Sequence, residues 1–185
     1  MRLHRVSTVL AGLVLALSAG PLAADTIITG SVGRAFSGDL QSGHTSYGAA
    51  IGFMGEGVFG LEVEGTYTPH FFGDTPAGSS NVTTLMGNLI LGAPMGQTVR
   101  VYATGGVGLM KFRVPDVDQF FDVNRNDFGM NAGAGVMIHF GGGALGARGD
   151  VRYFRNLKQS DTSDIAVDLG GFHYWRGSVG VTLKF

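Results

Sequence analysis

The chain has 185 residues, with 13 Lys and Arg against 14 Asp and Glu, 32 glycines and no cysteine. The formal charge of −1 gives no reason to expect a nucleic-acid partner, and the lack of cysteine excludes disulfides, thiolate chemistry and cysteine-based metal sites. The glycines have no fixed period and only 5 prolines accompany them, which argues against collagen-like or low-complexity sequence.

The first residues have the pattern of a secretory signal peptide. Arg2 and Arg5 precede an apolar run over 9–17, and Ala23 and Ala24 offer small residues for cleavage before Asp25. The apolar run is too short to cross a membrane as a helix, and no later segment approaches the roughly 18 apolar residues that a spanning helix needs. We therefore expect a signal peptide at 1–24 and one mature domain at 25–185.

The rest of the chain alternates apolar and other residues with a period of two, the period of a β-strand. The alternation is clearest in 128–140, where Phe128, Met130 and Val136 share one face. The facing of the first segment is left open. Eight strands are expected, at 26–35, 45–54, 58–67, 83–92, 98–112, 128–140, 145–154 and 174–185.

The connections between these segments alternate between short and long. The short ones are 55–57, 93–97 and 141–144, and the long, polar ones are 36–44, 68–82, 113–127 and 155–172. One rim of an up-and-down barrel would then carry turns and the other loops, as in outer-membrane barrels. Most of the acids fall in the long connections: Asp39, Asp74, Asp116, Asp118, Asp122, Asp127, Asp161, Asp164 and Asp168.

A soluble barrel with an apolar interior would show the same alternation, so the composition of the apolar face has to decide. In the last seven segments that face carries no Asp, Glu or Arg, and its only lysine, Lys111, lies at a loop-side end where it could snorkel. Its aromatic residues fall into a loop-side girdle of Tyr47, Tyr67, Phe128, Tyr153 and Trp175 and a turn-side girdle of Phe53, Phe59, Phe140 and Phe185. This pattern predicts an all-β fold, an eight-stranded antiparallel up-and-down transmembrane β-barrel.

The opposite face would point into the lumen, and it carries many charges. The interior of an eight-stranded barrel is about wide enough for side chains to fill. Charges buried there need partners of opposite sign. Because the third and seventh strands face each other across the ring, Glu62 and Glu64 are expected to pair with arginines of the seventh strand. The hypothesis is a charged plug, and the alternative is a gated or narrow ion path. The predicted luminal charge network contains Glu62, Glu64, Arg100, Arg148, Asp150, Arg152 and Arg176, with Lys184 facing the same way.

The segments 101–109 and 150–154 and the terminal Phe185 resemble the small eight-stranded outer-membrane proteins of the OmpA transmembrane-domain and opacity-protein type. The resemblance implies the outer membrane of a Gram-negative cell, reached through the periplasm, with outer-membrane lipids and lipopolysaccharide around a monomer. It also implies that the barrel-assembly machinery reads Phe185 as an assembly signal. Full-length OmpA-type proteins continue into a peptidoglycan-binding domain, so a cell-wall tether is not expected here.

Residues for chemistry are sparse. The five histidines show no metal-ligand spacing, and a lipid A modifying enzyme would need a nucleophile and a base together at the outer rim, whereas Ser178 is expected in the lumen and His173 outside. We expect no catalytic, cofactor or metal site. The favoured function is a structural or adhesion role through the loops, with a host or surface ligand; the segment 113–127, with Phe120 and Phe121 among acids, is either a contact surface or an ordinary solvated loop. The alternatives are a narrow pore for small solutes or ions and, beyond it, lipid A modification.

Overall fold

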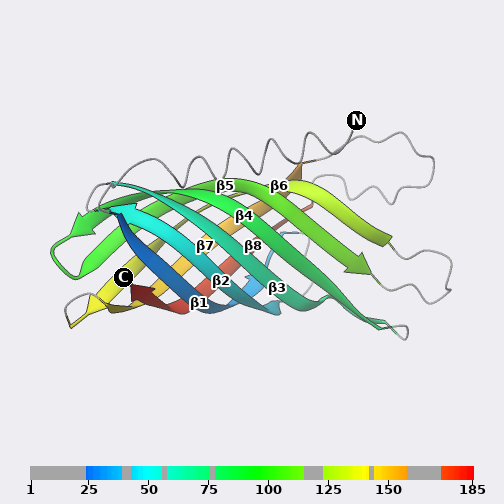
Figure 1. The fold of residues 1–185 in the computed structure, drawn as a ribbon. Coiled ribbons are helices and arrows are strands. Elements are labelled where there is room, and N and C mark those ends of the chain that lie inside the picture. The colour runs from blue at the N-terminus through cyan, green and yellow to red at the C-terminus, as the bar shows by residue number, and fades with distance from the viewer. Residues whose placement is uncertain are drawn as a thin grey trace.

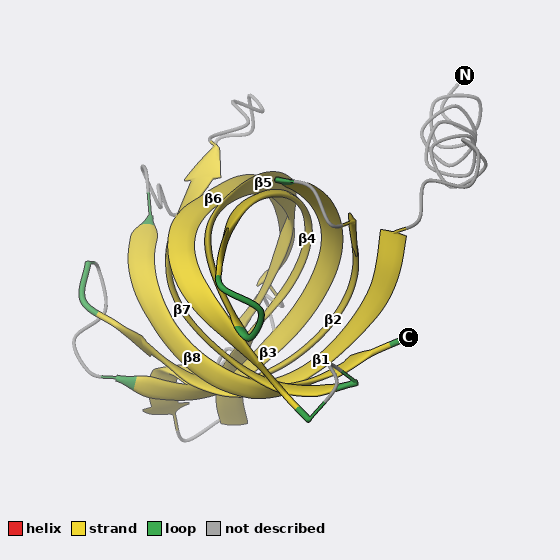
Figure 2. Ribbon diagram, turned by 90° about the vertical axis from the view of Figure 1, so that its left-hand side faces the viewer, coloured by secondary structure: helices red, strands yellow, loops and turns green. Residues whose placement is uncertain are grey.

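The computed structural model describes residues 24–38, 43–55, 58–75, 78–114, 123–141, 144–157 and 172–185. In these ranges the chain forms eight strands that run obliquely around one axis (Figure 1), and the view along that axis looks into a ring (Figure 2). No helix in the described ranges has the length and apolar composition needed to cross a membrane. The strands are β1 Ala24–Phe36, β2 His44–Gly55, β3 Phe59–Thr75, β4 Gly78–Met95, β5 Val99–Val114, β6 Val123–Phe140, β7 Leu145–Leu157 and β8 His173–Lys184.

Each strand pairs antiparallel with its neighbours in sequence, and β8 closes on β1. At this seam the pairing runs from Ile27 with Lys184 to Phe36 with Trp175. Beyond it, Thr26 and Phe185 exchange two backbone hydrogen bonds of 3.1 and 2.9 Å. A closed ring leaves no unpaired strand edge, which is the requirement for strands that cross a bilayer. The predicted eight-stranded antiparallel barrel is confirmed.

A line through paired residues moves steadily along the barrel axis as it passes from strand to strand around the ring. A ladder that starts at Thr26 on β1 returns to β1 at Phe36, ten residues further along (36 − 26 = 10); its intermediate members are Phe53, Leu61, Leu89, Gly105, Ala132, Tyr153 and Trp175. This stagger is the shear of the barrel, and it tilts the strands against the axis. Residues at equal height on neighbouring strands are therefore offset by about one and a quarter residues from their ladder partners.

The short connections join β2 to β3, β4 to β5 and β6 to β7 at one rim, which we call the turn rim; the opposite end is the loop rim. The predicted long loop at 68–82 is wrong, because β3 extends to Thr75 and β4 begins at Gly78. The hairpin continues past Pro69 through a register shift between Pro69 and Asp74, with His70 at a φ of 56°. The loops predicted at 113–127 and 155–172 are likewise shortened, because β6 begins at Val123 and β7 ends at Leu157.

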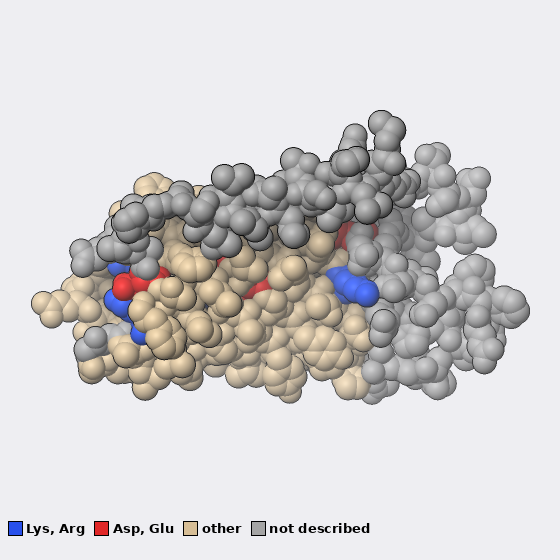
Figure 3. Space-filling model, viewed as in Figure 1, with Lys and Arg blue, Asp and Glu red and all other residues tan. Residues whose placement is uncertain are grey.

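The outer face is apolar, and the described charged atoms on the face shown in Figure 3 gather mainly near the two ends of the barrel. All nine predicted girdle residues occupy outward positions; eight are exposed, and Tyr153 is half-buried between His173 and Trp175. On β1, Ile28, Val32 and Phe36 face outward. Two arginines also lie on the outer face near the loop rim, Arg34 on β1 and Arg155 on β7. Arg155 departs from the predicted charge-free face because β7 is longer than expected.

Several predictions fall outside the described residues. These are nearly the whole signal peptide at 1–24, the paired aromatics Phe120 and Phe121, and the loop acids Asp39, Asp116, Asp118, Asp122, Asp161, Asp164 and Asp168. They stay predictions.

Two neighbouring glycines on β5 allow the packing on the inner and outer faces of the barrel wall to be compared. A Cβ on the inward Gly106 would lie 2.9 Å from the Cα of Asn88, whereas a Cβ on the outward Gly105 would meet nothing nearer than the Asn131 carbonyl oxygen at 3.8 Å. We expect Gly106→Ala to destabilise the barrel by about 1–3 kcal/mol through overpacking, and Gly105→Ala to stay within about 0.5 kcal/mol of the parent. Urea unfolding midpoints in lipid vesicles measure this, and equal midpoints for the two variants would contradict it.

Candidate functional site

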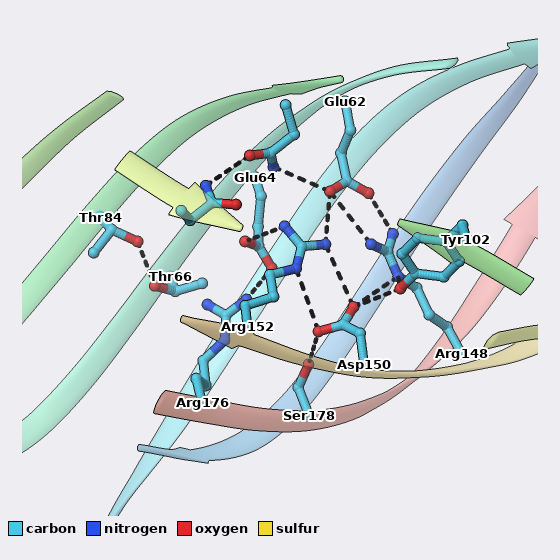
Figure 4. Close-up of polar contacts among 12 residues, drawn as sticks. Glu62, Glu64, Thr66, Thr84, Tyr102, Arg148, Asp150, Arg152, Arg176 and Ser178 are labelled. Atoms are coloured by element: carbon cyan, nitrogen blue, oxygen red, sulfur yellow. Dashed lines mark hydrogen bonds and ion pairs between the residues drawn. The ribbon is translucent and has the colours of Figure 1, made fainter. Parts of the chain in front are cut away.

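Six charged side chains from three strands meet inside the barrel and form what we call the luminal network (Figure 4). They occupy alternate inward positions, so the strand period alone aims them at the lumen. All are buried, and Arg152 is fully enclosed, with 0% of its surface exposed. The members are Glu62 and Glu64 on β3, Arg148, Asp150 and Arg152 on β7, and Arg176 on β8.

The two glutamates bridge the lumen to the opposite strands. Glu62 binds Arg148 through Oε2, and its Oε1 accepts hydrogen bonds from Nη2 of Arg152 at 2.9 Å. Glu64 accepts from Nη1 of Arg152 at 3.1 Å and from Nη2 of Arg176 at 2.6 Å. Each carboxylate therefore contacts two guanidinium groups, and Arg152 is shared between the two glutamates.

Asp150 completes the network from the β7 side. Its Oδ2 accepts hydrogen bonds from Nε of Arg148 at 3.0 Å and from the hydroxyl of Tyr102 at 2.7 Å, and its Oδ1 accepts from Ser178 at 2.9 Å. Nε of Arg152 forms an ion pair with Oδ1 at 3.3 Å. Three carboxylates thus meet three guanidinium groups, and the luminal network has no formal net charge, the condition under which buried ions are tolerated best.

Two predicted inward bases lie elsewhere. Arg100 is half-buried near the turn rim and donates to the carbonyl oxygen of Gly55 at 3.3 Å, so its predicted membership of the luminal network is wrong. It is the second residue of β5, and Tyr102 fills the next inward position between it and the acids. Lys184 pairs with Asp25 at 2.7 Å in a contact more than a third exposed. Arg100 and Lys184, the bases in excess of the inward acids, therefore lie away from the lumen centre.

Sequence reasoning missed the neutral polar side chains that extend the network. Asn88 donates to Glu62 at 3.2 Å and accepts from Asn131 at 2.7 Å, which carries the hydrogen bonds across β4 to β6. The hydroxyls of Thr66 and Thr84 are 2.6 Å apart. Their inward register was readable from the period of two, but no charge drew attention to them. Asn88, Tyr102 and Ser178 thus add hydrogen bonds to carboxylate oxygens that the arginines also contact.

Clusters of mainly apolar, buried side chains lie on both sides of the luminal network. Toward the loop rim, Phe154 stacks on Tyr174 with ring centroids 5.1 Å apart, and the Arg176 guanidinium lies over the Phe154 ring at 4.8 Å. Toward the turn rim, Arg148 lies over the ring of Tyr102 at 4.9 Å. We call these groups the loop-side seal, Ala35, Val82, Met86, Met110, Phe154, Phe172 and Tyr174, and the turn-side seal, Ile27, Met54, Ile90, Tyr102 and Met137.

A small polar cavity lies beside the luminal network, with about 10 Å³ of space that the centre of a water molecule can occupy. Its walls come from β1, β2, β3, β7 and β8, and carboxylate and hydroxyl groups face it. Such a space is suited to water, because several polar groups can each bind it. The lining residues are Thr29, Ser31, Ala50, Glu64, Arg148, Asp150, Ser178 and Gly180.

The two residues weighed for enzyme chemistry lie on opposite faces of β8. Oγ of Ser178 donates to Asp150 inside the barrel, whereas the ring of His173 packs outside against Tyr153 with centroids 5.7 Å apart. The wall of the barrel separates them, so they do not form a nucleophile and base pair.

Comparisons with solved structures show the same architecture at low identity. The N-terminal β-barrel domain of OprF from Pseudomonas aeruginosa is 18% identical, with a TM-score of 0.58, over 87% of this chain and 97% of that one. Neisserial surface protein A is 15% identical, with a TM-score of 0.63, over 88% and 97%. Ail, the attachment invasion locus protein of Yersinia pestis, is 12% identical, with a TM-score of 0.58, over 88% and 99%. These likenesses show the fold alone.

No curated protein matches the sequence. A family model does, and it covers residues 9–185, which is almost the whole chain. With the closed barrel, its apolar outer wall and its charged lumen, this match places the protein in a family of outer-membrane barrels. The chain belongs to the outer membrane protein beta-barrel domain family.

Proposed function

We propose that the protein is a closed, non-enzymatic outer-membrane barrel whose role is structural or rests on contacts made by its loops. The observation that supports this proposal is the neutral ion network inside the barrel, with a cluster of mainly apolar, buried side chains on either side of it. The separation of Ser178 from His173 supports a role without catalysis.

A permeating ion would meet two different obstacles. It would lose water at the loop-side and turn-side seals, whose side chains are mostly apolar, and hydrophobic constrictions exclude ions by dewetting. Between the seals it would have to separate guanidinium and carboxylate groups that are bound to each other. Both obstacles lie in series along the same axis, so the barrel is expected to be closed.

Planar-bilayer recording tests the closed lumen. We expect the refolded parent protein to show no steady conductance. Steady single channels from the parent would overturn the closed barrel and favour the second candidate function, a narrow pore for small solutes or ions. The observation that favours that candidate is the small polar cavity beside the luminal network, because a water molecule placed there would hydrate part of the path.

The luminal network is also proposed to stabilise the barrel. Glu62→Gln leaves Arg148 and Arg152 buried with one carboxylate fewer, and breaking a buried pair in this way costs about 3–5 kcal/mol. The matched control is Asp25→Asn, which removes an acid whose pair with Lys184 is more than a third exposed; surface pairs contribute about 0.2–1 kcal/mol. Urea unfolding in lipid vesicles compares the two variants.

A second variant separates loss of the ion pair from a general defect in packing. Glu62→Gln combined with Arg148→Met removes both partners, so we expect it to recover much of the lost stability. If Glu62→Gln unfolds at the urea concentration of the parent, the network does not stabilise the barrel.

The loop rim is proposed to face the cell exterior, where its connections could meet a host or surface ligand. The longer connections, which join β5 to β6 and β7 to β8, lie at this rim, opposite the short turns. Ail is an attachment invasion locus protein, and its structure is a complex with a heparin analogue. This supports adhesion as the function of the loops of this chain. The surrounding partners are then outer-membrane lipids and lipopolysaccharide, with Phe185 read by the barrel-assembly machinery during insertion.

Protease added to intact cells tests this orientation. We expect cleavage within 115–122 or 158–171, since both segments join strands at the loop rim. The turn at 96–98 serves as the internal control and should be cut only after the outer membrane is opened. The reverse pattern, with protection of the loop rim in intact cells, would invert the barrel.

A further inference from the structure

The outer wall has one hollowed region, across β6, β7, β8 and β1. Small outward residues form its floor, with Ala134, Gly149 and Gly177 lying between larger valines. A Cβ on Gly149 would meet nothing nearer than the Ser178 carbonyl oxygen at 3.8 Å, so the floor is open toward the membrane. We call this hollow the wall groove, and it is lined on its outer face by Val32, Ala134, Val136, Gly149, Val151, Gly177 and Val179.

The wall groove continues toward the loop rim. A second hollow shares Ala134 and Val151 with it and is bounded above by Tyr153 and Trp175 of the loop-side girdle. Together they form an apolar path from the interface toward the middle of the barrel. This is the course that an acyl chain takes in the leaflet next to the loop rim.

Positive charge lies at the upper end of this path. Arg155 is two residues above Tyr153 on the outward face of β7, and Arg34 faces outward on β1, where it is paired with Gly177 of the groove floor. The Arg34 guanidinium lies beside Gly43, just before the start of β2, on the side of β1 away from the groove, so Arg155 is the arginine nearest the path. Arginine binds phosphate through its planar guanidinium group, often with two hydrogen bonds.

We propose that the wall groove and Arg155 form a binding site for a phosphate-bearing lipid of the outer leaflet, with an acyl chain along the groove and the phosphate at Arg155. A second copy of the chain is a poorer occupant, since a symmetric contact through this face would bring the arginines of both copies to one interface. The assignment of the leaflet rests on the orientation proposed above, but the binding itself does not.

Trp175 is the only tryptophan of the chain and it borders the path, so its fluorescence reports on the site. The probe is quenching by brominated lipids, with the refolded protein in phosphatidylcholine vesicles that contain either brominated phosphatidic acid or brominated phosphatidylcholine. We expect phosphatidic acid to quench more strongly at equal content. Arg155→Gln should reduce that preference about fivefold, because each cation near a lipid phosphate contributes about that factor. Lys111→Gln, an outward cation on β5, is the matched control and should leave the preference unchanged.

Filling the groove tests the acyl-chain half of the site. Ala134→Leu occupies the part shared by both hollows and should weaken quenching by phosphatidic acid, whereas Ala49→Leu, on an equally outward alanine of β2, should not. Equal quenching by the two lipids in the parent, or a preference that survives Arg155→Gln, would overturn the proposal. Cross-linking between copies through Val179→Cys in this cysteine-free chain would overturn it in favour of a dimer. Vesicles present the same lipids to both rims, so failure here is distinct from failure of the protease test.

Discussion

The narrow bore of an eight-stranded ring is the constraint on which the rest of the structure depends. Across such a ring, side chains from opposite strands come within hydrogen-bonding distance, so an inward charge is held close to whatever faces it. Glu62 on β3 and Arg148 on β7 meet for this reason, although 86 residues separate them in sequence. The bore leaves no room for a hydrated ion between them, and charge balance therefore has to come from the protein itself.

The charges at the lumen centre balance because of where the basic side chains lie as well as how many there are. Tyr102 separates Arg100 from the acids, and Lys184 is paired with Asp25 at the rim, so three bases and three acids remain at the centre. The seals place mainly apolar side chains at both ends of this group, and an apolar surrounding strengthens each ion pair and makes each unpaired charge more costly. A network of this kind behaves as one unit, because Arg152 contacts all three carboxylates.

The sequence predicted the elements that depend on the period of two and failed where local chemistry competes with it. Glu62, Glu64, Arg148 and Arg152 were assigned to the lumen correctly because inward and outward positions alternate without interruption. The hairpin of β3 and β4 was missed because Pro69 and Asp74 favour turns, and pairing with the neighbouring strand overrides that preference. Arg100 was misplaced because alternation gives the face of a residue but not its depth. The seals were missed because the strand pattern assigns large apolar residues such as Met86 to no particular layer.

Strand β7 shows how alternate residues of one strand face two different surroundings, the polar lumen and the apolar outer side of the barrel. Its inward positions hold Arg148, Asp150 and Arg152, and its outward positions hold Gly149, Val151 and Tyr153. The inward arginines are long enough to reach across the bore, while the outward residues become larger from Gly149 to Tyr153, toward the loop rim. The taper of the outer face from glycine to tyrosine produces the wall groove, and it is independent of the ion pairs on the other side. A change that fills the groove can therefore leave the luminal network intact, since successive side chains point to opposite faces of the wall.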